Sequence, residues 1–335
     1  MNILLTLDYE LFNGLVGGTV EKCLITPMNK LEEILDKYHF QVTLFVDACF
    51  LLSLKKYKQK NPIFEADWVQ ITSQLRRFSD KGHSIQLHLH PQWLNAKYYE
   101  GKWHSDLNLY KLADLTEYDA ICLFFDGCEL IKSITGKSPV AFRAGDYCAQ
   151  TFKSLTSVLK QVGISIDSSV LRNKRVVNDR EWFDYLNIPK DYNYRFSDSV
   201  TNCDNKGHLV EVSIPTYKHH PIDVFYRKKK IDKSLSKTWG DGESSTGGKL
   251  DKGLMKYINR LKLLLNPIRM SASIDGISAT YLEDIYKYEK RKKSPYMMIM
   301  GHPKTFTPLY LQIFEEFVSK MEADDKSITI ENFVL

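Results

Sequence analysis

Short apolar runs alternate with longer segments of helical period along this chain, and this alternation constrains the fold more than any other feature. The first run spans residues 3–8, and Leu31, Ile34 and Leu35 then recur at the spacing of one helix face. A strand at 41–46, a helix at 64–81 and a strand at 83–90 repeat the same order. Such repetition is typical of βαβ units, which build a parallel sheet.

The pattern continues to the end of the chain. Further strands are predicted at 140–143, 164–167, 209–214, 268–273 and 296–300, and further helices at 116–135, 150–162, 254–265 and 308–321. About eight strands with intervening helices predict a closed or nearly closed parallel barrel, although a doubly wound open sheet explains the same alternation. We expect one domain over 1–335, with a mobile loop at about 232–251 that is rich in glycine, serine and lysine.

Composition excludes several other classes of protein. With 335 residues, of which 43% are apolar and 26% charged, the chain can bury a large core and lies near the average of soluble proteins, which rules out disordered and fibrous classes. The net charge of +5 is modest, and the basic runs at 228–230 and 291–293 are short and come without a nucleic-acid-binding motif. We therefore expect no nucleic-acid partner.

The amino terminus and the cysteines bear on localisation. The first apolar run stops at Asp8, too early for a signal peptide, and no window offers the roughly 18 apolar residues that cross a bilayer. The six cysteines are scattered without a CxxC pair, as expected of reduced thiols. A cytoplasmic protein without a membrane span is therefore predicted, while nothing in the sequence indicates its oligomeric state.

The residues that end the strands are the candidates for chemistry, because the active site of a parallel α/β fold forms at the carboxyl ends of its strands. His88 and His90 give the sharpest signal: residues i and i+2 share one face of a strand, roughly 7 Å apart, and two imidazoles at that distance can bind one ion. A pair of hydrogen-bonded core histidines is the alternative. Asp8 and Glu10 have the same spacing, so one carboxylate could bind metal while the other acts as a base.

Other strand ends carry further candidates, which are Arg143, Asp146, Tyr147, Asp167 and His302. Arg143 could hold a carboxylate base through a bidentate pair, with a plain salt bridge as the alternative. His302 is placed for a general acid, and Asp167 could line a sugar site or cap the next segment. Trp93 and Tyr147 could stack on a sugar ring, although rim or core packing explains both equally well.

Taken in order, these motifs resemble the polysaccharide deacetylase, or NodB-homology, superfamily. The matching fragments are Leu5-Thr6-Leu7-Asp8-Tyr9-Glu10, Thr43 to Val46, Gly82-His83 through His88 and His90, Phe142-Arg143-Ala144-Gly145, Asp167-Ser168-Ser169 and Met300-Gly301-His302. They extend from residue 1 to about 305. Within the superfamily the chain is most similar to divergent members found with bacterial O-antigen and surface-glycan genes.

The resemblance implies a distorted (β/α)7-8 barrel and a metal-dependent hydrolase that removes an acyl group from a sugar or glycan. By position it assigns Asp8 as the catalytic base, His88 as a metal ligand, Arg143 as the residue that steadies the base and His302 as the general acid. The expected cofactor is a divalent metal, most simply zinc, and the expected partner is the sugar substrate.

Two positions depart from the family pattern. Tyr9 stands where a second aspartate usually binds the metal, and Gln92 stands where the second histidine is usually found. We expect Glu10 and His90 to replace them as ligands, a set that suits zinc, although Asp8 and Glu10 could exchange roles.

Amide hydrolysis is the reaction expected of this set. A bound metal would polarise the carbonyl and activate a water, Asp8 would take the water's proton, and His302 would protonate the departing amine. One alternative is a glycoside hydrolase on a related barrel. Another is a glycan-binding or assembly protein without catalysis, which the tyrosine at position 9 motivates.

Overall fold

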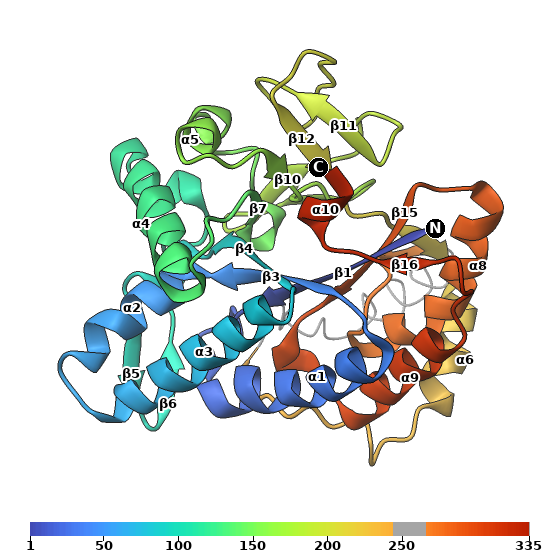
Figure 1. Ribbon diagram of the computed structural model, residues 1–335, viewed down its shortest axis with the longest axis horizontal. Helices are drawn as coiled ribbons and strands as arrows, with labels where there is room; N and C mark the ends of the chain where they lie inside the picture. Colours follow the sequence, from blue (N-terminus) through green and yellow to red (C-terminus); the bar gives the residue numbers. More distant parts are fainter. Residues whose placement is uncertain (244–265, 335) are drawn as a thin grey trace, which may run out of the picture.

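A strongly curled sheet organises the computed structural model, which describes residues 1–243 and 266–334 (Figure 1). Eight strands of the described chain follow one another across this sheet: β11 (Asn193–Phe196), β12 (Leu209–Val212), β8 (Ile166–Asp167), β7 (Ala141–Ala144), β4 (Ser84–Leu89), β3 (Val42–Asp47), β1 (Asn2–Tyr9) and β15 (Tyr296–Gly301). A short strand, β16 (Lys326–Ser327), also pairs with β1. Every neighbouring pair is parallel except β11 and β12. The predicted parallel α/β sheet is confirmed.

The two edges of the sheet approach each other. The hydroxyl of Tyr296 on β15 donates to the backbone oxygen of Ser213, just after β12, at 2.7 Å, and Ser273 forms an isolated parallel bridge to Met300 of β15. The sheet is therefore a half-barrel, and the side chain of Tyr296 links its two ends. This confirms the distorted barrel and excludes a doubly wound open sheet.

The strand expected at 268–273 needs a correction. Only Ile268–Met270 is a strand, β14, and it pairs antiparallel with β13 (Tyr217–His219) in a separate two-stranded sheet. Other short strands of the described chain form small sheets of their own: β2 (Val16–Gly18), β5 (Lys97–Tyr99) and β6 (Lys102–His104) in one, and β9 (Arg175–Val177) and β10 (Trp182–Asp184) in another. Short hairpin strands carry too few alternating residues to predict from periodicity.

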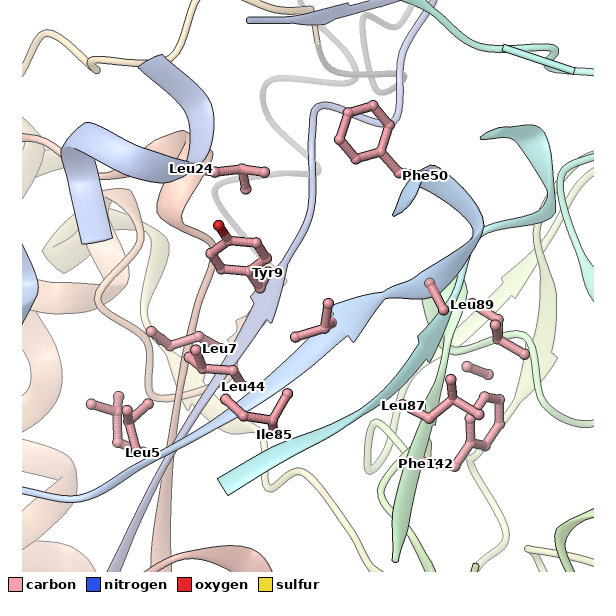
Figure 2. Packing of buried hydrophobic residues seen from close by; sticks show 14 of the residues in the cluster. Leu5, Leu7, Tyr9, Leu24, Leu44, Phe50, Ile85, Leu87, Leu89 and Phe142 are labelled. Atoms are coloured by element: carbon pink, nitrogen blue, oxygen red, sulfur yellow. The ribbon is translucent and has the colours of Figure 1, made fainter. Parts of the chain in front are cut away.

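Alternate side chains of the strands face outward and pack under the helices. Figure 2 shows Leu7, Leu44 and Leu87, from β1, β3 and β4, on this side of the sheet. Burying each such side chain contributes roughly 1.5–3 kcal/mol, so this layer is the main source of stability. The helices that cover it include α1 (Thr26–Tyr38), α3 (Ile63–Asp80), α4 (Glu117–Thr135) and α9 (Pro308–Ser319). The bounds of α3, α4 and α9 lie within a few residues of the prediction, and α1 contains the helical spacing of Leu31, Ile34 and Leu35.

Several helices differ from the prediction. The helix expected at 150–162 is shorter, α5 (Leu155–Gln161), while α2 (Ala48–Lys58), α6 (Pro221–Lys230) and α8 (Leu282–Lys292) were not predicted. α2 follows β3 without a turn, because the side chain of Asp47 caps it by accepting a hydrogen bond from the backbone of Cys49 at 3.0 Å. The helix predicted at 254–265 lies outside the described residues.

The inner face of the sheet is apolar at one end and polar at the other. Leu4, Phe45 and Met298 belong to a buried cluster inside the curl, which also includes Ile330 of the carboxy-terminal helix α10 (Ile330–Val334). The backbone N–H of Ile330 donates to Thr43 Oγ1 at 3.0 Å and fixes that helix against the inner face. Since this end is filled by side chains, the carboxyl ends of the strands remain for polar residues.

The described part of the expected loop, 232–243, contains no helix or strand but is held in place. Asp241 accepts a hydrogen bond from the backbone of Thr19 at 2.8 Å, and the backbone of Glu243 donates to Val16 at 2.7 Å. The rest of that loop lies outside the described residues. Within the ranges described, no helix is both long and apolar enough to cross a membrane.

Candidate active site

Side chains from three parallel strands converge at the carboxyl end of the half-barrel. Asp8 on β1, His88 on β4 and Arg143 on β7 lie on the inner face, and Glu10 and His90 follow β1 and β4 two residues further along. All five are buried, with at most 3% of their surface exposed. Because residues i and i+2 of a strand share one face, these predicted site residues all lie on the inner face and meet at one end of the sheet.

Glu10, His88 and His90 form one compact group. Oε2 of Glu10 lies 3.2 Å from Nε2 of His88 and 2.6 Å from Nε2 of His90, and one donor atom from each of the three residues lies within 4.8 Å of the others. The charge of Glu10 outweighs burial and raises the pKa of His90 to about 10. Two imidazole nitrogens and a carboxylate oxygen converging on one point form a donor set that zinc prefers.

The far side of each ring is held by an acceptor. Nδ1 of His88 donates to the backbone oxygen of Arg143 at 2.7 Å, and Nδ1 of His90 contacts Oε1 of Gln92 at 3.3 Å. With Nδ1 carrying a hydrogen, Nε2 of each ring faces Glu10, the arrangement found behind metal-binding histidines. Gly145 leaves space for the ring of His90, because a Cβ at position 145 would lie 2.9 Å from His90 Nδ1 and 2.6 Å from the backbone oxygen of Leu89.

Two residues of this group were missed from the sequence. Lys304 is buried, and its ammonium contacts Oε1 of Glu10 at 2.7 Å and the backbone oxygen of Leu11 at 3.0 Å. Asp47, at the end of β3, accepts from the backbone of His90 at 3.3 Å, and burial raises its pKa to about 6. The only sequence signal for either residue is its position at or just beyond a strand end.

Asp8 and Arg143 form a buried ion pair beside this group. Nη1 of Arg143 lies 2.6 Å from Oδ1 of Asp8, and its other nitrogens donate to Thr6 Oγ1 at 3.0 Å and to the backbone oxygen of Ser168 at 3.0 Å. Burial alone would raise the pKa of Asp8, but the charge of Arg143 outweighs it and holds that pKa well below its ordinary value. Asp8 is therefore ionised, and its other oxygen, Oδ2, faces His302.

His302 follows β15 and is oriented by a second aspartate. Its Nε2 lies 3.4 Å from Oδ2 of Asp8, and its Nδ1 lies 2.7 Å from Oδ2 of Asp275. Burial lowers the pKa of His302, but the charge of Asp275 outweighs this effect and raises the pKa to about 10. Asp275 was not predicted, because it lies just after a single isolated bridge, at Ser273, rather than in or directly after a regular strand of the sheet.

A cavity of about 180 Å³ opens onto these groups. It is lined by Asp8, Glu10, Asn13, His90, Asp146, Tyr147, His302, Lys304 and Thr305. Asp146 and Tyr147 both line this cavity, and both adopt left-handed backbone conformations, with φ of 46° and 62°. Such conformations cost of order 1–3 kcal/mol each in non-glycine residues and are concentrated at functional sites.

Two expected substrate contacts are not supported by their placement. Trp93 has none of its surface exposed and packs edge-on against Phe50 at 5.5 Å between ring centroids, so its face is covered by core residues. Asp167 is also fully buried, opposite Glu211 on the neighbouring strand, and does not line the cavity. A short helical turn follows His90 and turns Trp93 inward, a change of direction that strand periodicity does not predict.

No family model and no curated protein sequence matches this chain. Among solved structures, it is similar to a protein described as a polysaccharide deacetylase from Mycobacterium smegmatis, with 13% identity, a TM-score of 0.53 and 99% and 87% of the two chains covered. The chain has the fold of the polysaccharide deacetylases. An allantoinase has the same fold, with 11% identity, a TM-score of 0.50 and coverage of 99% and 88%. A 4-alpha-glucanotransferase from Thermococcus litoralis also matches, with 10% identity, a TM-score of 0.52 and 100% of this chain but 40% of the other covered.

The resemblance drawn from the motifs is thus confirmed at the level of the fold. One fold here carries enzymes named for different reactions, so it does not by itself identify the reaction. The chemistry of this chain must be argued from the geometry of its own site.

The buried pair of Arg143 and Asp8 generates a stability prediction. Arg143→Met leaves the Asp8 carboxylate buried without its partner, and we expect a loss of about 3–5 kcal/mol in the free energy of unfolding. The double change Asp8→Asn with Arg143→Met removes both charges and should recover part of that loss. Urea unfolding measures both values.

The matched control is Arg180→Met, at an exposed arginine, which should change the free energy of unfolding by no more than about 0.5 kcal/mol. Equal losses at positions 143 and 180 would show that the buried pair has no special role in stability.

Proposed function

We propose that this protein is a metal-dependent hydrolase that removes an acyl group from the amide nitrogen of a sugar or glycan, in bacterial surface-polysaccharide metabolism. The observation that carries the proposal is the convergence of Glu10, His88 and His90 on one point, with Asp8 and His302 facing each other beside it. Metal-dependent amide hydrolysis needs a donor set for a cation, an ionised carboxylate as base and a cationic imidazole as acid.

The residues present fit a divalent metal, with zinc as the first choice. His88 and His90 would bind through Nε2, since their Nδ1 atoms are engaged, and Glu10 would bind through Oε2. Lys304 already occupies Oε1 of Glu10, which leaves one oxygen of that carboxylate for the cation. When bound, such a metal polarises a carbonyl and lowers the pKa of a coordinated water toward about 7.

Asp8 and His302 would supply the proton transfers. The charge of Arg143 keeps Asp8 ionised, so Oδ2 can accept a proton from an attacking water. His302 carries a proton on Nε2 and would donate it to the departing amine nitrogen, while Asp275 holds its Nδ1. Both transfers take place within the same small cavity.

The size of the cavity at Asp8 and His302 agrees with these roles. At about 180 Å³ it is smaller than the roughly 300–1,000 Å³ of sites that enclose a whole drug-sized ligand. It would therefore hold the acyl group and the scissile bond, while the sugar lies across the mouth near Asn13, Asp146 and Tyr147.

A glycoside-cleaving reaction is the second candidate, supported by the similarity in fold to the glucanotransferase. Retaining enzymes need two carboxylates on either side of the bond, one of them a free nucleophile. Here Oε2 of Glu10 contacts two histidines and Oε1 contacts Lys304, while Oδ1 of Asp8 contacts Arg143. The amide reaction would keep Asp8 paired with Arg143 and Glu10 paired with Lys304, with the cation between Glu10 and the two histidines. The glycosidic reaction would instead need one of these carboxylates as a free nucleophile.

Product analysis tests the proposed function. Incubation of the metal-loaded protein with N-acetylated oligosaccharides should release acetate and leave free amines, without new reducing ends. Release of new reducing ends without acetate would favour the glycosidic reaction, and neither product across a panel of N-acyl sugars would contradict the proposal.

The metal site has its own prediction. His88→Ala and His90→Ala should each lower bound zinc by at least about tenfold, because each removes one of three protein ligands. Elemental analysis after dialysis measures the ratio of metal to protein. His83→Ala is the matched control, since His83 lies on the same strand segment but contacts Phe78 outside the site, and it should keep its metal. Equal metal content in all three variants would contradict a metal site formed by His88 and His90.

The acid role of His302 has a separate test. His302→Asn should keep its metal yet lose about 10²–10⁴-fold in turnover, the usual contribution of a positioned acid, whereas exposed His39→Asn should be unaffected. Asp275→Asn should lower the pKa of His302 and so shift the alkaline limb of the kcat/KM profile to lower pH, because Asp275 stabilises the protonated ring. An unchanged profile would contradict the role given to Asp275.

A further inference from the structure

A second cavity, of about 580 Å³, lies between the β13–β14 sheet, the start of α6 and one face of α8. It shares no lining residue with the cavity at Asp8 and His302. Its lining is rich in cationic and tyrosine side chains, among them Lys218, Arg269, Arg291, Tyr217, Tyr281 and Tyr288.

Positive charge exceeds negative charge in the lining. Its two carboxylates, Asp223 and Asp284, are both already bonded to Arg227, at 3.2 Å and 2.6 Å. Within 1–243 and 266–334, neither Arg269 nor Arg291 has a carboxylate partner. Arg269 only reaches the side-chain and backbone oxygens of Thr216, at 3.4 and 3.5 Å. These guanidinium groups are therefore available to an anion from outside.

Two neighbouring groups also favour a bound anion. Lys174 is half-buried, and its pKa is lowered first by burial and then by the charge of Arg269, so the two cations repel each other. Nε2 of His219 is shielded from solvent and has no hydrogen-bond partner among the described residues. Both features are costs that a bound anion with acceptor oxygens would offset.

Tyrosine rings line the rest of the cavity. Tyr217 and Tyr288 meet edge to face at 6.1 Å between centroids, and Tyr288 keeps 46% of its surface exposed. Tyr281 is covered on one side by the guanidinium of Arg227, at 4.0 Å from the ring centroid. Amphipathic rings with polar hydroxyls suit a ligand that is part apolar and part polar, such as a sugar ring.

We infer that this cavity is a binding site for a phosphorylated sugar, separate from the site of hydrolysis. Arg269 and Arg291 would hold the phosphoryl oxygens, since the planar guanidinium fork matches phosphate geometry, and Tyr288 would contact the ring. The volume lies within the range of sites that enclose a small ligand. The inference stands independently of the proposed reaction.

Calorimetric titration of the full chain with N-acetylglucosamine 1-phosphate tests the inference, with N-acetylglucosamine and inorganic phosphate as comparison probes. We expect the sugar phosphate to bind at least about tenfold tighter than either comparison probe, because each comparison lacks one half of the contacts. Arg269→Gln and Arg291→Gln should each weaken binding by about tenfold, the worth of one charge-assisted contact, and Arg269→Lys by less.

Two control variants distinguish binding in this cavity from binding elsewhere on the protein. Lys229→Gln removes one charge from α6 outside the cavity lining and should leave binding within about twofold of the parent, as expected for a screened surface charge. His88→Ala should also bind the sugar phosphate normally. Thermal melting without ligand verifies that each variant folds. If either arginine change unfolds the chain, Tyr288→Ala, at a half-exposed residue of the cavity lining, takes its place.

Three outcomes would overturn the inference. Equal weakening in Lys229→Gln would mean that only the overall positive charge is sensed. Loss of binding in His88→Ala would place the ligand in the active-site cavity. Absence of binding at millimolar sugar phosphate, or equally tight binding of inorganic phosphate, would remove the phosphorylated sugar as the ligand.

Discussion

The buried carboxylate of Glu10 is the group around which the mouth of the half-barrel is arranged. An ionised carboxylate removed from water costs several kcal/mol unless it is paired, and this one contacts His88, His90 and Lys304. Burial alone would raise the pKa of Glu10, but the charge of Lys304, and then that of His90, lower it well below its usual range. Three segments must therefore meet at one point, and the parallel registers of β1, β4 and β15 bring them there.

A second group of compensating charges lies beside Glu10 and its partners. Asp8 is compensated by Arg143 on one oxygen and faces His302 on the other, while Asp275 compensates His302 from behind. The two carboxylates, two residues apart on one strand face, thus have different partners. Glu10 is surrounded by donors that a cation could replace, whereas Asp8 is fixed by a guanidinium that never loses its charge. This difference favours Glu10 as the ligand and Asp8 as the base, the alternative that the sequence left open.

The sequence predicts side-chain directions well inside strands, where successive side chains face opposite sides of the sheet. It predicts them poorly where the chain leaves a strand. Asp8, His88 and Arg143 sit inside or at the ends of buried strands, so their face followed from their neighbours. Trp93 lies in a short helical turn, and Lys304 lies in another after β15, so alternation says nothing of their directions. Tertiary contacts decide both positions: Trp93 fills a space against Phe50 and Gly17, and Lys304 pairs with Glu10.

The departures from the family pattern have a structural explanation. Tyr9 lies on the outer face of β1, where its hydroxyl donates to Gln74 at 2.9 Å, so position 9 offers no ligand to the inner face. Gln92 lies in the turn after β4 and supports His90 from behind. Glu10 and His90 occupy the inner face that both departures leave free, which is why the donor set keeps a carboxylate and two imidazoles.

One stretch of chain connects the two cavities. Arg269 belongs to β14 and lines the larger cavity, and six residues later Asp275 holds the backbone and the ring of His302. Between them, the backbone of residues 272–274 is bonded to Met300 on both sides, at 2.8 and 2.9 Å. A segment fixed at both ends transmits small displacements better than a free loop, because packed and hydrogen-bonded elements do not deform continuously. Arg269 and Asp275 thus belong to one hydrogen-bonded segment that borders both cavities.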